Sequence, residues 1–328
     1  MSPSEEPFAN ALQACEEGRA ADLARLLRDS PELVKHADED GWTLLLAACD
    51  AFTGERALPP VEASAQQHAV LELLLSAGAD PSASDAEGWA PLHTAAMTGN
   101  EDLANTLLKA GAARAGNLLG TEGGSALALA LFYAKPALGE LLAQPSVSDN
   151  LRTAAALGRD LDRFFEGQTP SAAAKIGLDF YRPTAQWPDW ERTFERQELL
   201  DEALAWAARN GQVGSLQALV ARGANVNSNS YRGTPLLWAI YSDREDVATW
   251  LLDHGADPDL KHDFGGTGHG VGAVAMHLAA QYSGLKCLRL LLERGADMEI
   301  QDDGFSATPM EWAMHSDAEA AVRMLTDF

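Results

Sequence analysis

The stretch from 260 to 280 holds the densest set of residues that could do chemistry, with five glycines and three histidines in twenty-one positions. His262, Asp263 and His269 lie close together in it, and neutral imidazole and carboxylate groups are ligands that zinc accepts. Fixing three ligands on a glycine-rich loop costs conformational entropy. The pattern therefore leaves a metal site as one hypothesis and favours a mobile contact loop.

The same stretch also matches the spacing of a phosphate-binding loop. Gly268, Gly270 and Ala273 fit the string G-x-G-x-x-A and precede an expected helix. That string has meaning only between a strand and a helix of an alternating strand and helix pattern, which the flanking sequence lacks. A phosphate cradle is therefore the weaker hypothesis for these glycines.

Candidate acid and base groups occur elsewhere, among them Asp201, Glu202 and Glu311. None of them falls in a spacing that joins a nucleophile to a base or that forms a metalloprotease motif. The sequence accordingly predicts no catalytic residue and no cofactor. It leaves a small-molecule-binding protein or an enzyme as the alternative to a binding module.

Aromatic residues give the clearest pattern of possible contacts. Trp206, Trp238 and Trp312 recur at one position of three similar segments, and Leu278 fills that position in a fourth. The indoles could pack as core between helices or form a contact strip for a partner. We predict that a partner or ligand contacts the three tryptophans together with Tyr181, Trp187, Trp190, Arg232, Tyr241 and His269.

Some of these aromatic residues belong to an insert from about 167 to 197 that a regular repeat does not need. Long loops with aromatic content are commonly packed lids or binding elements. Both roles stay open for this insert. If it closed over the tryptophans, it would form a pocket for the alternative, small-molecule function.

The composition limits the class of partner. The 328 residues carry 24 Lys and Arg against 48 Asp and Glu, a formal net charge of −24. Such a field repels phosphate backbones and anionic membranes, so we expect neither nucleic acid nor a membrane as partner. The three cysteines are far apart and suggest neither a disulfide framework nor a zinc knuckle. Because the sequence shows no recognisable export signal, we expect the protein in the cytoplasm. We also expect it to be a monomer.

The elements that would position these residues are repeats. Five segments share one ending with glycine: "LLLSAGADPSASD" (73–85), "LLKAGAARAGN" (107–117), "LVARGANVNSN" (219–229), "LLDHGADPDLK" (251–261) and "LLERGADMEIQD" (291–302). A second block precedes such endings, as in "WAPLHTAAMTGN" (89–100), "GTPLLWAIYSD" (233–243) and "ATPMEWAMHSD" (307–317). Thr234 and Thr308 before proline predict capped helix starts, and glycine after a second helix suits a left-handed turn.

Together the two blocks resemble the ankyrin repeat over most of the chain, with about nine units similar to stand-alone bacterial arrays. The resemblance implies an all-α solenoid of helix-turn-helix units with finger loops, in which His93 and His277 bond backbone groups between units. The stretch 260–280 then becomes a lengthened finger. The repeats suggest three parts, at 1–149, 150–198 with the eroded repeat and the insert, and 199–328. In the middle, 123–149 and 150–198 lose the Thr-Pro and Gly-Ala-Asp signatures, yet we expect each to keep a pair of helices.

The expected function follows from this architecture. Stacked repeats offer a long concave surface, and proteins of this kind bind other proteins through first helices and finger tips. The acidic charge favours a basic protein partner and salt-dependent association. We therefore predict a non-enzymatic interaction module.

Overall fold

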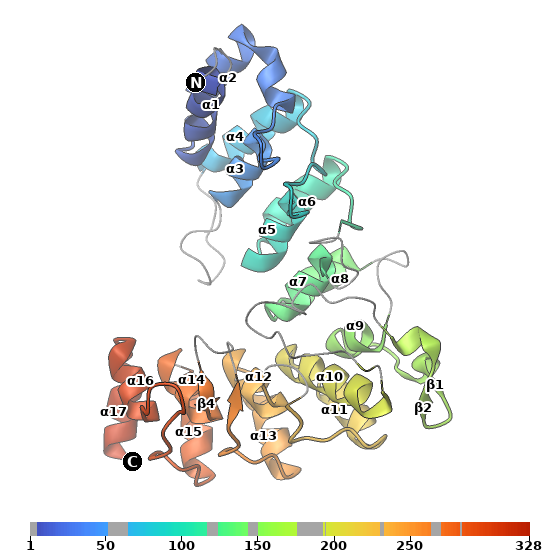
Figure 1. Cartoon of the computed structure of the whole chain (residues 1–328), viewed down its shortest axis with the longest axis vertical. Coiled ribbons are helices and arrows are strands. Elements are labelled where there is room, and N and C mark those ends of the chain that lie inside the picture. The colour runs from blue at the N-terminus through green and yellow to red at the C-terminus, as the bar shows by residue number, and fades with distance from the viewer. Residues whose placement is uncertain are drawn as a thin grey trace. The chain divides into compact units, whose positions relative to one another are not determined.

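The computed structural model of the chain describes residues 5–51, 65–116, 124–143, 150–175, 193, 195–229, 233–263, 270–282 and 284–328 (Figure 1). Its contacts divide the chain into two compact units, with the boundary in sequence after Val147. In both units the described residues are mostly helical, and short helices follow one another in pairs. The predicted all-α repeat architecture is confirmed.

The first unit holds four consecutive helix pairs. The first helices α1, α3, α5 and α7 contact each other in turn, and each is followed by its own second helix. Their bounds are α1 (Glu5–Glu16), α2 (Ala20–Asp29), α3 (Leu44–Asp50), α4 (Ala65–Ser76), α5 (Pro91–Thr98), α6 (Glu101–Lys109), α7 (Ala126–Phe132) and α8 (Pro136–Leu142), with a 3-10 turn at Pro31–Lys35.

The second unit begins with a single helix and continues with four pairs. Its helices are α9 (Leu151–Ala156), α10 (Arg196–Arg209), α11 (Val213–Val220), α12 (Pro235–Tyr241), α13 (Glu245–Asp253), α14 (Ala275–Gln281), α15 (Leu285–Glu293), α16 (Pro309–His315) and α17 (Glu319–Asp327). Two small antiparallel hairpins join them, β1 (Phe165–Glu166) with β2 (Thr169–Pro170) and β3 (His262–Asp263) with β4 (Val271–Ala273).

The second unit has two layers of helices (Figure 1). First helices α10, α12, α14 and α16 contact each other in turn, while second helices α11, α13, α15 and α17 form the other layer. One continuous cluster of buried side chains runs between the layers from Leu151 to Leu325. Alanines such as Ala207 and Ala239 occupy it and let the helices approach closely. We call the surface of the four first helices the first-helix face.

The helix ends follow the predicted chemistry. The hydroxyl oxygens of Thr234 and Thr308 accept hydrogen bonds from the third residues of α12 and α16, Leu237 and Glu311. Pro235 and Pro309 occupy the first turns, where no partner for an N–H is needed. All five repeat glycines that follow second helices have positive φ, from 76° at Gly295 to 97° at Gly111. A side chain would be strained there.

The middle of the chain keeps one of the two expected helix pairs within its described residues. The prediction that 123–149 keeps a helix pair is confirmed by α7 and α8. Within 157–175, however, no second α-helix follows α9; two 3-10 turns, Asp162–Phe164 and Ala172–Ala174, flank the β1–β2 hairpin instead. Gly158 and Gly167 adopt positive φ and interrupt helical backbone. The predicted total of nine units stays a prediction.

Candidate functional site

The three tryptophans of the predicted strip lie in α10, α12 and α16 and are buried. Their relative exposures are 2% for Trp206, 1% for Trp238 and 6% for Trp312. Leu278 of α14 packs in one cluster with Trp238, as expected for residues at the same repeat position. In this conformation other side chains cover Trp206 and Trp238, so a partner would touch those side chains and not the two indoles.

Two arginines cover two of these indoles: Arg152 of α9 lies over Trp206, and Arg209 of α10 lies over Trp238. The guanidinium carbon of Arg152 lies 4.2 Å from the centre of the Trp206 ring, and that of Arg209 lies 3.9 Å from the Trp238 ring. Arg152 also forms an ion pair of 3.0 Å with Glu202, and both side chains are 3% exposed. A planar guanidinium is weakly hydrated and stacks on an indole, so it tolerates such burial better than an ammonium group.

Two tyrosines carry the aromatic row toward the surface. Tyr241 meets Trp238 edge-on at 5.8 Å and Tyr282 at 5.3 Å between ring centroids. Tyr282 follows α14 and is 51% exposed. Burial of its hydroxyl, with the nearby Tyr241, raises the pKa of Tyr282 to about 12. Tyr282 is therefore a neutral aromatic contact at physiological pH.

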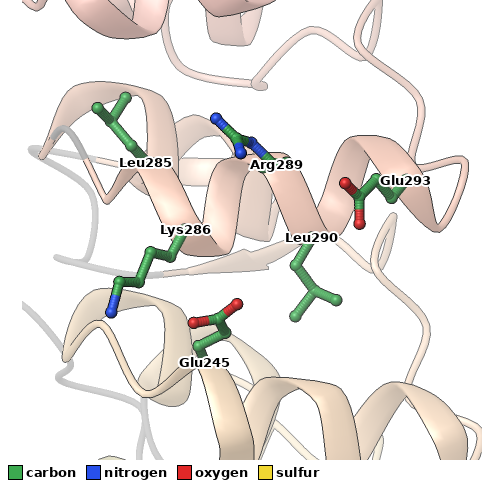
Figure 2. Close-up of a pocket in the computed structure, with 6 residues that line it drawn as sticks. All are labelled: Glu245, Leu285, Lys286, Arg289, Leu290 and Glu293. Carbon is green, nitrogen blue, oxygen red and sulfur yellow. The ribbon is translucent and has the colours of Figure 1, made fainter.

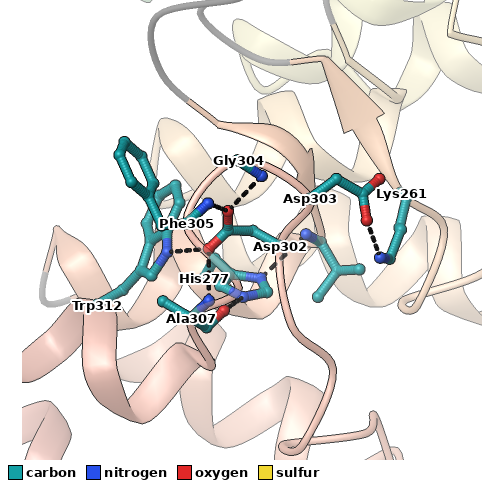
Figure 3. A network of polar contacts seen from close by, with 9 residues as sticks. Lys261, His277, Asp302, Asp303, Gly304, Phe305, Ala307 and Trp312 are labelled. Atoms are coloured by element: carbon teal, nitrogen blue, oxygen red, sulfur yellow. Dashed lines mark hydrogen bonds and ion pairs between the residues drawn. The ribbon is translucent and has the colours of Figure 1, made fainter.

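A compact loop before α16, residues 302–307, forms what we call the last finger (Figure 3). The Asp302 carboxylate accepts bonds from the N–H groups of Gly304, Phe305 and Ala307, and from the indole N–H of Trp312 at 3.0 Å. Burial pushes the pKa of Asp302 up, but these donors outweigh it and hold that pKa below its ordinary value. The carboxylate thus ties the finger to α16.

A pocket of about 420 Å³ lies between the last finger and the first-helix face. Phe305, 65% exposed, stands at its rim. The N–H and hydroxyl groups of Thr308 donate to Glu311 and lower the pKa of that carboxyl, so it is ionised at neutral pH. The lining residues are Gln281 of α14, Phe305, Ser306 and Ala307 of the finger, and Glu311, Trp312 and His315 of α16.

The repeat histidines have the structural role that the resemblance implied. His277 Nδ1 accepts the Val274 N–H, and its Nε2 donates to the Ala307 carbonyl at 3.0 Å. His93 bonds Ala90 N–H and the Gly124 carbonyl in the same way. Burial lowers the pKa of both rings, which keeps them neutral. Each histidine joins one repeat to the next finger.

A second, smaller pocket of about 180 Å³ lies on the second-helix layer (Figure 2). Glu245 of α13 lies on the side of α15 toward which Lys286 extends, and Arg289 of α15 also belongs to the lining. Glu293 and two leucines complete the lining. Charges of both signs within so small a space offer no distinct recognition chemistry, so the 420 Å³ pocket is the better candidate site.

The described residues of the stretch 260–280 form the β3–β4 hairpin and most of α14. His262 pairs with Ala273 in the β3–β4 hairpin, and the imidazole is 2% exposed. Burial, together with the neighbouring His277 ring, lowers the pKa of His262 to about 3. His269, Gly268 and the Asp263 side chain lie outside the described residues, among which no group of three potential ligands occurs.

Of the phosphate-loop string, only Gly270 and Ala273 lie in the described residues, and there the chain forms a hairpin. Val271–Ala273 forms an antiparallel strand with His262–Asp263, not the turn between a strand and a helix. The phosphate string needs backbone N–H groups that converge at a helix start. Here the hairpin register instead directs this backbone to its neighbouring strand.

The candidate acid and base groups of α10 have structural partners. Asp201 accepts bonds from the Asn225 N–H at 2.7 Å and from Gln197 at 2.8 Å, which joins two repeats. Burial raises the pKa of Asp201 despite these bonds. Glu202 is paired with Arg152. Both carboxylates therefore organise the repeat stack.

The remaining predicted contacts lie outside the described residues. They are Tyr181, Trp187, Trp190, Arg232 and His269, together with the insert between 176 and 192. Gln281 and Phe305 line the pocket but were not among the residues predicted from the sequence. Gln281 could have been found from register, because it is the last residue of α14 as Arg209 is of α10. Phe305 gave no signal in a loop where apolar residues are ordinary.

Family models locate the repeats along the chain. A model of three ankyrin repeats matches residues 61–153 and 191–262, and a single ankyrin-repeat model matches residues 272–303. These matches cover more than half of the chain. Among the described residues, no helix has the length and apolar character that crossing a membrane requires.

Similar proteins include inversin of Mus musculus, 32% identical over 124 residues, which are 37% of this chain and 11% of inversin. Protein PhlB of Serratia liquefaciens is 32% identical over 112 residues, 34% of this chain and 46% of PhlB. The ankyrin repeat domain-containing protein SAT10 of Stachybotrys chartarum is 29% identical over 240 residues, 73% of this chain and 11% of SAT10. The chain thus spans less than half the length of each of these relatives.

Proposed function

The chain belongs to the ankyrin-repeat family, and from that premise we propose that it is a non-enzymatic module that binds a basic protein through its first-helix face and fingers. Ankyrin repeats indicate a protein–protein interaction module. The observation that carries the finer proposal is the placement of exposed apolar residues. Among the described residues, four large apolar side chains are exposed, and three of them lie near the ends of α14 and α16. Tyr282 directly follows α14, Phe305 lies in the last finger, and Met314 lies in α16.

Charge supports a basic partner. The chain carries 24 more acidic than basic residues, because 48 minus 24 is 24. A protein with this net charge attracts basic surfaces over distances up to the Debye length, and association then weakens as salt rises. Exposed aromatic residues beside an ionised carboxylate, as at Phe305 and Glu311, suit a partner surface with cations and apolar stems.

Asp201 and Glu202 of α10 hold repeats together through Asn225 and Arg152. We also propose a reducing compartment such as the cytoplasm, with the chain acting as a monomer. Cys15, Cys49 and Cys287 are buried free thiols. Burial raises the pKa of Cys15 and Cys287 to about 12, so these thiols are poor nucleophiles.

Site-specific photo-crosslinking tests this proposal in extract of the source cells. A benzophenone amino acid is placed at Tyr282 or Met314, and at Glu293 as the control, which is exposed at the end of α15 in the other layer. We expect positions 282 and 314 to capture one and the same basic protein at low salt, with capture lost in 0.5 to 1 M salt, where screening acts over roughly 3 Å.

Position 293 is expected to capture little of that protein. Equal capture from 293 would contradict binding at the first-helix face. If none of the three positions captured a protein at low salt, the interaction-module proposal itself would fail. A single Tyr282→Ser variant, exposed and therefore tolerated by the fold, should also weaken the complex in a direct binding assay.

A further inference from the structure

We propose that the 420 Å³ pocket beside Trp312 binds an arginine side chain supplied by the protein partner. This inference rests on the proposed function, because it names what the partner presents at one place on the first-helix face. The reason is that the chain itself contains a filled version of the same arrangement, at the interface between α10 and α12.

The filled version is formed by Arg209 and Trp238. Arg209 is the last residue of α10, and Trp238 is the fourth residue of α12, the next first helix. The guanidinium lies 3.9 Å from the indole centre and 5.4 Å from the Tyr241 ring. The end of one first helix thus places a cation on the tryptophan of the following repeat.

The same two positions line the pocket at the α14–α16 interface. Gln281 is the last residue of α14, and Trp312 is the fourth residue of α16. An uncharged side chain therefore stands where Arg209 stands, and the space beside it is a pocket of about 420 Å³. None of the lining residues, all within the part of the chain that the structure describes, is Lys or Arg.

One residue that lines the pocket, Gln281, also carries a buried acceptor. The Gln281 side-chain oxygen is buried and accepts no hydrogen bond from the described residues. A buried acceptor without a donor is unfavourable, and native structures rarely keep one without a reason. A guanidinium in the pocket would bring five N–H donors beside Gln281 while the group stacks on the aromatic wall.

Compared with the α10–α12 interface, the pocket has an additional negative charge, which favours a cation from outside the chain. The residue before Trp312 is Glu311, whereas the residue before Trp238 is Leu237. Thr308 keeps Glu311 ionised, as its lowered pKa shows. Phe305 adds a second aromatic ring at the rim. Arginine fits better than lysine, because its flat, weakly hydrated guanidinium can stack and hydrogen-bond at once, as Arg209 stacks on Trp238.

The test is a titration of the full chain with N-acetyl-arginine methylamide, followed at the indole N–H resonance of Trp312 and assigned by Trp312→Phe. The citrulline analogue, a neutral copy of arginine, and the lysine analogue are the matched probes. We expect saturable, millimolar binding of the arginine probe, and about fivefold weaker binding of citrulline and a smaller loss for lysine. Equal affinity for arginine and citrulline, or a shift that does not saturate, would overturn the proposal.

Variants sharpen the test. Glu311→Gln keeps an acceptor for Thr308 and removes the charge, and it should weaken the arginine probe about fivefold. Gln281→Arg supplies the cation within the chain, as Arg209 does, and should abolish probe binding. Gln281→Met is the uncharged control, which should weaken probe binding without abolishing it, because the pocket keeps its aromatic wall and Glu311. Met314→Ala is the exposed control outside the lining residues and should bind the probe unchanged. Unchanged binding by Gln281→Arg, with the fold intact by circular dichroism, would also overturn the proposal.

This failure is distinguishable from failure of the proposed function. If Gln281→Arg and Glu311→Gln retained full capture in the crosslinking experiment at position 282, the first-helix face would still bind a protein. Only the arginine pocket would then be wrong. If position 282 captured nothing while the arginine probe bound, the pocket would stand and the protein-binding proposal would fail.

Discussion

Trp238 and Trp312 occupy the same position of two first helices, yet their surroundings differ. Trp238 lies under Arg209 and beside Tyr241, and it is 1% exposed. Trp312 is bonded to Asp302, lies 5.1 Å from the His277 ring and forms one wall of a pocket. One interface is closed by the chain itself and the other presents a recess. The repeat position determines that both indoles are buried between first helices. The residues that face each indole determine whether the surface there is closed or has a pocket.

The strongest challenge to the comparison is to remove the indoles. Trp238→Ala should lower the free energy of unfolding by about 3–5 kcal/mol, because it leaves a large cavity under a buried guanidinium. Trp312→Ala should cost less, because Trp312 borders a pocket and belongs to the last repeat. Urea unfolding followed by circular dichroism measures both. Equal losses would show that the two interfaces are packed alike.

Acid should separate the two interfaces next. Burial lowers the pKa of His277 and of His262, the latter to about 3, so the native state holds both rings neutral. Their contribution to stability is complete above pH 6.5 and is lost as pH falls toward the native-state pKa values, at about 1.4 kcal/mol per pH unit for each histidine. The α10–α12 interface lacks this histidine, because α10 has Ala205 at the position that His277 occupies in α14.

Hydrogen exchange at pH 7 and pH 4.5 checks this prediction. Amides of α14 and α16 should lose more protection at pH 4.5 than those of α10 and α12. The His277→Gln variant should be less stable at pH 7 and show a smaller change between the two pH values. A uniform loss across all four helices would argue that carboxylates, and not these histidines, control the acid response.

A double-mutant cycle compares the two interfaces directly. Arg209→Met combined with Trp238→Leu should give a coupling free energy of about 1–2 kcal/mol, the size of a desolvated cation–π contact. Gln281→Met combined with Trp312→Leu should give ~0 kcal/mol, since an amide makes no comparable contact. A coupling of similar size at both interfaces would contradict the idea that the Arg209–Trp238 contact is special, and with it the inference that the pocket lacks a comparable arginine.

The smallest expected effect concerns the helix starts. Thr234→Ala and Thr308→Ala should each cost about 1 kcal/mol of unfolding free energy, because each hydroxyl caps a first helix. Thr308→Ala should cost slightly more, since Thr308 and Glu311 cap each other reciprocally. Replacing both threonines with serine is the matched control and should restore most of the stability in the same urea assay. A larger loss for Thr234→Ala would contradict this order.

The sequence predicted more of the repeat unit than of the candidate site. Threonine caps, glycine turns and the bridging role of His277 were all predicted and are confirmed. After residue 150 a helix pair was expected within 150–198; within 157–175 no second α-helix is present, because positive-φ glycines and a short hairpin interrupt the helical backbone there. The pocket could not be predicted, because its walls come from α14, a finger and α16, whose side chains meet only when the repeats stack.

The sequence by itself determined where the repeat helices start and stop, because a cap or a turn depends on residues within one turn of each other, such as Thr308 and Glu311. It also determined that the surface is strongly acidic. Only the tertiary structure decided that Arg209 covers Trp238 while Gln281 opens a recess beside Trp312. Those partners lie in different repeats, and the physical reason is that stacking distance and side-chain direction, not spacing along the chain, decide which groups touch.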